Sequence, residues 1–276
     1  MYMAPVGGRH TKYVVLDTAQ LSCCDHHRRG ERELLTLNAD LGEGIGRHSF
    51  GNDAALMQLI DVANVACGFH AGDPAEMERT VHLAKEHAVA VGAHPGLPDL
   101  AGFGRRAMNL DPADVRRLIT YQTGALKAFL DAADLPLNHI KPHGALYGML
   151  ARDAKLMEAA AAVCKTFEVP FFGLAGTAHE QVCEAEGVGF VPELYVDLDY
   201  DNEGNLLIRP QPEEKTPEQV AQRLNQALEQ STIAAEDGTA VPVRFSSVCI
   251  HSDGGHSVQI AQRCREVLDA YGKERA

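Results

Sequence analysis

The sequence predicts one α/β domain whose parallel strands close into a distorted seven-stranded barrel. Two observations support this fold class. From residue 34 onward, short apolar or β-branched runs alternate with helical patterns, which is typical of parallel βα units. Titratable side chains follow five of the predicted strands, whereas an open sheet would concentrate its site at one switch point. A chain of 276 residues also suits one α/β domain better than two.

Strands and helices are predicted in alternation along the chain. The strands are expected near residues 34–39, 62–67, 88–93, 138–141, 170–174, 188–196 and 246–251. The helices are expected over residues 53–60, 74–87, 112–133, 154–167, 178–185, 217–230 and 257–271. Asp73 and Asp111 each precede a proline, so each is predicted to cap the helix that begins there.

Residues 1–33 lack this periodicity. They are predicted to be a disordered or non-catalytic extension, or the product of an upstream start codon, before a single catalytic domain over residues 34–276. Their dense polar cluster contains Cys23, Cys24, His26 and His27, but contiguous residues rarely converge on one tetrahedral metal.

Composition excludes several classes of function. The formal net charge of −13 argues against nucleic-acid binding, which requires basic clusters. No apolar run approaches the ~20 residues of a membrane span, so a soluble protein without a membrane partner is expected. The seven cysteines show no CxxC motif and no regular pairing, which together with the short N-terminal apolar run predicts a reduced, cytoplasmic setting.

The segment from Leu37 to Gly44 leads from a predicted strand into a glycine-rich turn. Asp40 and Glu43 lie in this turn, where a carboxylate could hold Mg²⁺, act as a general base or cap a helix. Gly42 and Gly44 would allow close backbone approach to a ligand, but the segment lacks the Gly-Lys-Ser/Thr ending of a Walker loop.

Imidazoles follow the next two predicted strands. His70 lies three residues before Asp73, and His94 is followed by a Pro- and Gly-rich stretch that is predicted to be a binding loop. Cys67 precedes His70, but its position at the end of an apolar strand favours a buried thiol over a nucleophile.

Cations are also available at strand ends. Arg105 and Arg106 could clamp a carboxylate or a phosphate, with a solvated pair as the alternative. Lys141 closes an apolar strand, where it needs an anionic ligand or a nearby carboxylate, Asp40 or Glu43. Ser252 lacks the GxSxG context of a triad nucleophile.

Three sets of site residues are therefore predicted. The catalytic candidates are Asp40, Glu43, His70, Asp73, His94, Lys141, His143 and Asp253. The candidates for binding substrate or phosphate are Gly42, Gly44, Asn64, Arg105, Arg106, Tyr147 and His251. The candidate metal ligands are Asp40, His70, His94 and His143.

Four long motifs together resemble the LamB/YcsF family over about residues 36–272. They are Asn38 to Gly44, Ala63 to Pro74, Gly92 to Gly96 with Asp99 to Arg106, and Lys141 to Tyr147. The resemblance implies a TIM-like barrel related to the glycoside hydrolase/deacetylase group. It also implies the A subunit of an ATP-dependent 5-oxoprolinase, which works with subunits B and C to convert the lactam 5-oxo-L-proline to L-glutamate. ATP and Mg²⁺, or another divalent metal, would be the cofactors.

The chain departs from the family pattern in its last third, where residues 210–215 also lack the family's usual Gly-Ala. Leu198 stands where the family usually has an arginine, and Ser252 stands in a segment that is usually His-Gly-Asp. Two other functions remain open. One is a metal-dependent, deacetylase-like hydrolase, and the other is a divergent subunit that binds a lactam without turnover.

Overall fold

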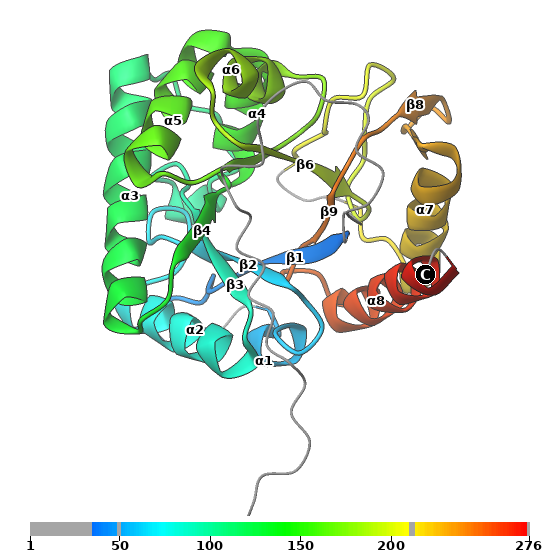
Figure 1. Ribbon diagram of the computed structural model, residues 1–276, viewed down its shortest axis with the longest axis horizontal. Coiled ribbons are helices and arrows are strands. Elements are labelled where there is room, and N and C mark those ends of the chain that lie inside the picture. Colours follow the sequence, from blue (N-terminus) through cyan, green and yellow to red (C-terminus); the bar gives the residue numbers. More distant parts are fainter. Residues whose placement is uncertain (1–34, 49–50, 210–212, 275–276) are drawn as a thin grey trace, which may run out of the picture.

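Seven parallel strands form a closed barrel in the computed structural model, which describes residues 35–48, 51–209 and 213–274. The strands follow the order β1-β2-β3-β4-β5-β6-β9, and helices surround them (Figure 1). The distorted seven-stranded barrel expected from the sequence is confirmed. The predicted extension over residues 1–33 lies outside the described residues.

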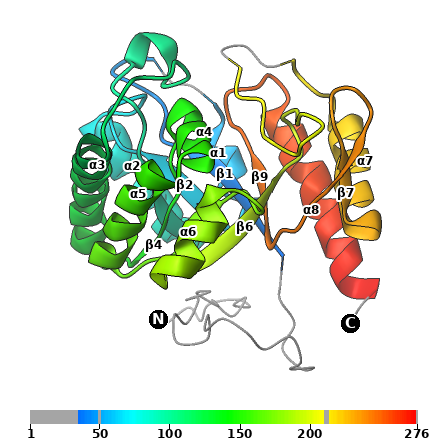
Figure 2. The same ribbon diagram turned by 90° about the horizontal axis from the view of Figure 1, so that it is seen from above.

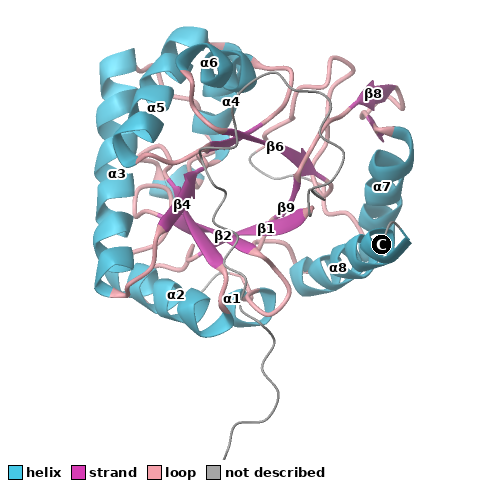
Figure 3. Cartoon of the chain, viewed as in Figure 1, coloured by secondary structure: helices cyan, strands magenta, loops and turns pink. Residues whose placement is uncertain are grey.

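The helices and strands alternate along most of the chain (Figure 3). The barrel strands are β1 (Thr36–Leu41), β2 (Val62–Ala66), β3 (Ala90–His94), β4 (Leu137–Ile140), β5 (Phe171–Gly173), β6 (Phe190–Tyr195) and β9 (Ser247–Ile250). The α-helices are α1 (Asp53–Leu56), α2 (Pro74–His87), α3 (Pro112–Ala132), α4 (Gly144–Arg152), α5 (Ala154–Phe167), α6 (Ala178–Glu186), α7 (Pro217–Gln230) and α8 (Ser257–Glu274). A 3₁₀ turn spans Leu100–Gly102, and β7 (Thr232–Ala234) pairs with β8 (Ala240–Pro242) outside the barrel.

The predicted helix caps are confirmed. Asp73 accepts hydrogen bonds from the backbone N–H groups of Ala75 and Glu76, and Asp111 accepts one from Asp114. These carboxylates satisfy amides that have no partner within the first turn of a helix.

Three features differ from the expected elements. The helix that begins at Asp53 ends at Leu56, because the chain must turn to enter β2 at Val62. Helix α4 was not predicted, since its two glycines disfavour a helix, but five of its residues are buried. The hairpin of β7 and β8 was also missed, although Asp237-Gly238 is a typical turn signal.

The main apolar core lies between the barrel and the surrounding helices. Side views show helices along the outside of the strands (Figure 2). Within the described residues, no helix is both long enough and apolar enough to cross a membrane.

Every second side chain of a barrel strand points inward, so the side chains inside the barrel form layers. One end holds a small apolar cluster of Val62, Phe172 and Val191. The next layer is polar, and its buried members include Asn38, Asn64, His139, Glu193 and Ser247. The interior therefore changes from apolar to polar along the barrel.

Hydrogen bonds link this polar layer across several strands. The Asn38 amide donates to Glu193 at 3.0 Å and to the Ser247 hydroxyl at 2.7 Å. The Asn64 amide donates to Asn38 at 2.8 Å. Gly92 on β3 makes room for the His139 ring, because a Cβ atom at this position would overlap that ring.

Candidate functional site

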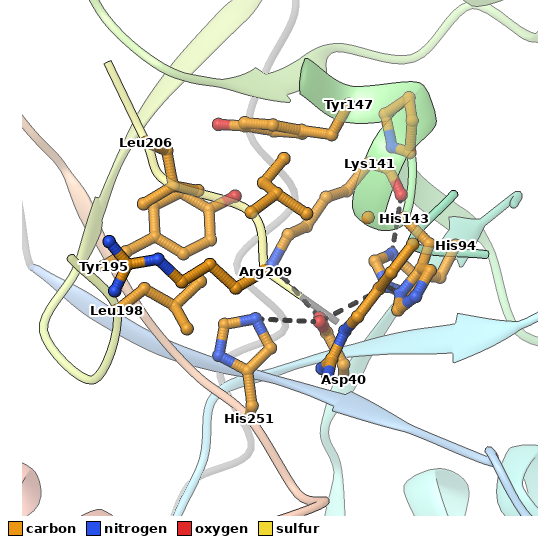
Figure 4. Close-up of a pocket in the computed structure, with 14 residues that line it drawn as sticks. Asp40, His94, Lys141, His143, Tyr147, Tyr195, Leu198, Leu206, Arg209 and His251 are labelled. Atoms are coloured by element: carbon orange, nitrogen blue, oxygen red, sulfur yellow. Dashed lines mark hydrogen bonds and ion pairs between the residues drawn. The ribbon is translucent and has the colours of Figure 1, made fainter. Parts of the chain in front are cut away.

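Ionisable side chains from four barrel strands line one pocket at the carboxyl ends of the strands. Asp40 lies on β1 and His94 ends β3, while Lys141 and His251 directly follow β4 and β9. Figure 4 shows Asp40 between Lys141, His94 and His251, with the pocket beside them. This is the end of a parallel barrel at which active sites are generally found.

Lys141 is the buried cation of this site. Its ammonium lies 3.1 Å from Asp40 Oδ1 and 3.3 Å from Glu193 Oε1, and it donates to Cys249 Sγ at 2.9 Å. Burial alone would lower the pKa of Lys141, but Asp40 and Glu193 raise it well above its ordinary value. Lys141 therefore remains a cation at neutral pH.

Asp40 is the carboxylate on which these contacts converge. It accepts a hydrogen bond from Asn64 at 2.8 Å, and its Oδ2 lies 3.3 Å from His94 Nε2 and 3.5 Å from His251 Nε2. Burial would raise the pKa of Asp40, but His94, Lys141 and His251 hold it well below its usual range. Asp40 is therefore ionised and fixed in place.

A second group contains three imidazoles and one carboxylate, all buried: Glu43, His70, His94 and His143. The rings of His70 and His143 stack with their centroids 3.8 Å apart. Burial lowers the pKa of both rings, and His94 acts in the same direction on each. Burial and the nearby Asp40 raise the pKa of Glu43.

The donor atoms of this group do not fit Mg²⁺. Magnesium prefers an octahedral set of oxygen ligands and retains several waters, whereas this group offers three imidazole nitrogens and a single carboxylate. Nitrogen-rich sets of this kind suit transition metals such as zinc. The expected Mg²⁺ therefore has no matching site in this cluster.

His251 is held by a further carboxylate, Asp197. The Nδ1 atom of His251 lies 2.9 Å from Asp197 Oδ2, which also accepts the His251 backbone N–H. Burial alone would lower the pKa of His251, but Asp197, with Asp40 and Asp253, raises it to about 9. His251 is therefore protonated at neutral pH and can act as an acid.

The pocket also has an apolar wall. Leu198, Leu206 and Ile208 line it together with the rings of Tyr147 and Tyr195. In Figure 4 the labelled members of this wall lie across the pocket from Asp40. A small molecule with both a hydrocarbon face and polar atoms would find complementary surfaces here.

Several predicted residues lie elsewhere or are already paired. Both carboxylate oxygens of Asp73 accept backbone N–H groups, one of them from Gly46, so Asp73 acts as a helix cap outside the pocket. Arg106 pairs with Asp99, and neither of these residues lines the pocket. Arg105 lines the pocket and pairs with Asp253 at 2.7 Å.

Three backbone N–H groups of the glycine-rich turn after β1 already have acceptors within the protein. The Gly42 N–H donates to Asp53, and the N–H groups of Ile45 and Gly46 donate to His48 and Asp73. The Gly42 N–H is therefore already engaged by a carboxylate, and the binding role of Gly44 stays a prediction.

Sequence reasoning missed four site residues: Asn38, Glu193, Asp197 and Cys249. Glu193 could have been found, because a carboxylate within an otherwise apolar strand must be paired when it is buried. Asn38 and Cys249 gave no such signal, since small polar side chains are common in strands without a functional role.

The closed barrel and its polar mouth define a TIM-like barrel protein with its site at the carboxyl ends of the strands. The chain is 42% identical in sequence to a lactam utilization protein from Thermus thermophilus whose crystal structure is known. That match covers 86% of this chain and 97% of the other, with a TM-score of 0.79.

Sequence comparisons lead to the same group. The profile of the LamB/YcsF family matches residues 35–276, and the chain belongs to this family. It is 43% identical to the lactam utilization protein lamB of Emericella nidulans, over 86% of this chain and 95% of that one. It is 44% identical to the A subunit of a 5-oxoprolinase from Methylococcus capsulatus, over 86% and 93% of the two chains.

Proposed function

We propose that this protein is the A subunit of an ATP-dependent 5-oxoprolinase, which opens the lactam ring of 5-oxo-L-proline to give L-glutamate. The observation that carries the proposal is the pocket at the barrel mouth, where Asp40, Lys141 and His251 face an apolar wall. Such a pocket suits a small ring with one hydrocarbon face and one amide. The names of the relatives point to the same substrate class.

A five-membered lactam resists hydrolysis, so its amide must be activated. In the proposed reaction the lactam oxygen takes the γ-phosphoryl group of ATP and ADP leaves. Water then adds to the activated carbon and the carbon–nitrogen bond breaks, which leaves the acyl phosphate of L-glutamate. A second water hydrolyses this acyl phosphate to L-glutamate and phosphate. Most of the barrier to such transfers is lowered by positioning and by charge stabilisation.

The site residues would divide this work. Lys141 supplies a fixed positive charge beside oxygens that become negative, and Asp40 holds Lys141 in position. His251, which Asp197 keeps protonated, would donate a proton to the ring nitrogen as the carbon–nitrogen bond breaks. Mg²⁺ would enter with ATP as part of the nucleotide substrate.

Several relatives are named as the A subunits of 5-oxoprolinases, which indicates proteins that work in a complex. We infer that subunits B and C complete the active assembly. The test is purification of this chain with candidate B and C subunits and measurement of ADP and L-glutamate formed upon addition of 5-oxoproline. ADP and L-glutamate in a 1:1 ratio, lost in Asp40→Asn, would support the proposal.

Two outcomes would favour the other functions. L-glutamate formed without ADP would indicate a hydrolase of the deacetylase type, for which the cluster of Glu43 with three histidines is the supporting observation. Binding of 5-oxoproline without turnover, even with both partners present, would indicate a subunit that only binds the lactam.

A further inference from the structure

His94 and His143 face one another through nitrogens that carry no proton in the neutral rings. His94 Nδ1 donates to the carbonyl oxygen of Lys141 at 2.7 Å, and His143 Nε2 donates to that of Phe103 at 2.8 Å. Because a carbonyl oxygen can only accept, each of these outer nitrogens must carry its hydrogen. The inner nitrogens, His94 Nε2 and His143 Nδ1, lie 3.0 Å apart, and Asp40 Oδ2 lies 3.3 Å from His94 Nε2. A cation, either a proton or a metal ion, is therefore needed between or beside these nitrogens.

Glu43 and His70 complete the group around these two nitrogens. Glu43 Oε1 lies 3.4 Å from His70 Nε2 and 3.7 Å from His143 Nδ1. One donor atom from each of the four residues lies within 4.8 Å of every other, and all four side chains are buried. The other ring nitrogen of His70 has no hydrogen-bond partner within the described residues.

A shared proton would join only one pair of these atoms, whereas a metal ion would be bound by all four. Ligands about 2.0–2.1 Å from a tetrahedral zinc lie about 3.3 Å from one another. Three of the six spacings between these donor atoms, 3.0, 3.4 and 3.7 Å, bracket that value, and all six are within 4.8 Å. The bonds from the outer nitrogens to carbonyls also match the way proteins orient histidine ligands.

We propose that Glu43, His70, His94 and His143 form a binding site for one divalent transition metal of the zinc class. Three imidazoles and one carboxylate suit zinc and its neighbours, and they disfavour Mg²⁺ and Ca²⁺. The set differs from the ligands expected from the sequence, because Glu43 takes the place of Asp40.

A second group, Asp40 with Cys249 and His251, is a weaker candidate. Its negative charge is already matched by Lys141, whose ammonium lies 3.1 Å from Asp40 and 2.9 Å from Cys249 Sγ. The other nitrogen of His251 is engaged by Asp197. A metal there would have to displace a buried ammonium.

The test is metal binding by the full-length, tag-free protein after treatment with a chelator and dialysis. Zinc is titrated by calorimetry, and cobalt is titrated by its visible d–d absorption. We expect one equivalent of either metal per chain. Glu43→Gln and His70→Gln should each weaken binding by at least ~100-fold, because each removes one of four ligands.

Two variants serve as matched controls. His82 is exposed on α2, so His82→Gln removes a histidine without touching the cluster and should leave the stoichiometry and affinity unchanged. Cys249→Ser alters the second group and should also leave binding unchanged. Circular dichroism and thermal melting establish that each variant is folded.

Three results would overturn the proposal. They are no zinc or cobalt binding by the wild-type protein, full binding by both cluster variants, or loss of binding in Cys249→Ser alone. If both cluster variants unfold, X-ray absorption of the zinc-loaded wild-type protein counts the imidazole ligands of the zinc instead. Three imidazole ligands support the site, and fewer than two reject it. These measurements do not depend on turnover. Zinc binding by a chain that hydrolyses no lactam even with subunits B and C would therefore reject the proposed function and leave the metal site standing.

Discussion

Lys141 and Asp40 form an ion pair in which both side chains are buried, with 3.1 Å between Nζ and Oδ1. The same ammonium lies 3.3 Å from Glu193 on β6, so one cation is shared by carboxylates from two separate strands. The pair thus neutralises buried charge inside the barrel and is also a part of the candidate site.

Breaking this pair should destabilise the protein as well as inactivate it. Asp40→Asn and Lys141→Met are each expected to lower the free energy of unfolding by about 3–5 kcal/mol, because each removes one partner of a buried ion pair. The double variant should lose clearly less than the sum of the two. Urea denaturation measures the stabilities, and lactam-dependent ADP formation should fall at least ~100-fold in each.

Lys127→Met is the matched control, because Lys127 pairs with Asp131 on the surface of α3. Its effect should stay below about 0.5 kcal/mol. Additive losses for Asp40→Asn and Lys141→Met would show that the two side chains are not energetically coupled.

Because of the ion pair of His251 with Asp197, the free energy of unfolding should fall as the pH becomes alkaline. The folded-state pKa of His251 is about 9, above the ordinary value of ~6.5, so its contribution is complete below pH ~6.5 and is lost as the pH rises through 9. That contribution is on the order of 3 kcal/mol. Asp197→Asn should reduce this dependence, which thermal unfolding at pH 6, 7.5 and 9 would detect. Equal slopes for both proteins would contradict the assignment.

Leu198 is expected to limit the activity on 5-oxoproline. It lies on the apolar wall of the pocket, and an arginine at this position could form a charge-assisted pair with the substrate carboxylate. Leu198→Arg should therefore lower the KM for 5-oxoproline by about tenfold, as measured with the same B and C subunits. Leu198→Met is the control for volume. If the arginine variant is no better than the wild-type protein, this departure from the family pattern has no bearing on substrate binding.

Gly96 is expected to fix the position of His70. A Cβ atom at residue 96 would overlap the His70 ring, so Gly96→Ala should destabilise the protein by about 1–3 kcal/mol and weaken zinc binding. Gly124→Ala, on α3 with open space around its added methyl, should instead be neutral or slightly stabilising. Unchanged zinc affinity in Gly96→Ala would show that the ring can shift without losing the metal.

Removal of residues 1–33 should leave the fold and activity intact. The first strand begins at Thr36, and the family profile begins at residue 35. Thermal unfolding and turnover of the shortened chain provide the measurement. Failure of this chain to fold would show that the segment is part of the domain.

The order of the barrel elements was predictable because each strand and helix has its own local pattern. Strand positions agree within a few residues, and Asp73 and Asp111 cap the helices that they were predicted to cap. Helix α4 was missed because packing of its apolar face outweighs the low helix propensity of its glycines.

The candidate site was predictable where polar side chains follow strands. Asp40 and His94 lie near the carboxyl ends of their strands, Lys141 and His251 directly follow theirs, and all four line one pocket, although their roles in catalysis stay predictions. The pairing of Lys141 with Glu193 could not be predicted, because it depends on how β4 and β6 approach one another across the closed barrel.

The hydrogen-bonded layer inside the barrel has a consequence for how this protein can evolve. Asn38, Asn64, Glu193 and Ser247 bind one another through specific donors and acceptors, so replacement of one leaves another buried group without a partner. Selection should remove single substitutions at these four positions, whereas paired substitutions that restore the hydrogen bond between two strands can be retained. These positions should therefore vary together among related chains, and the apolar contacts around the barrel should vary independently.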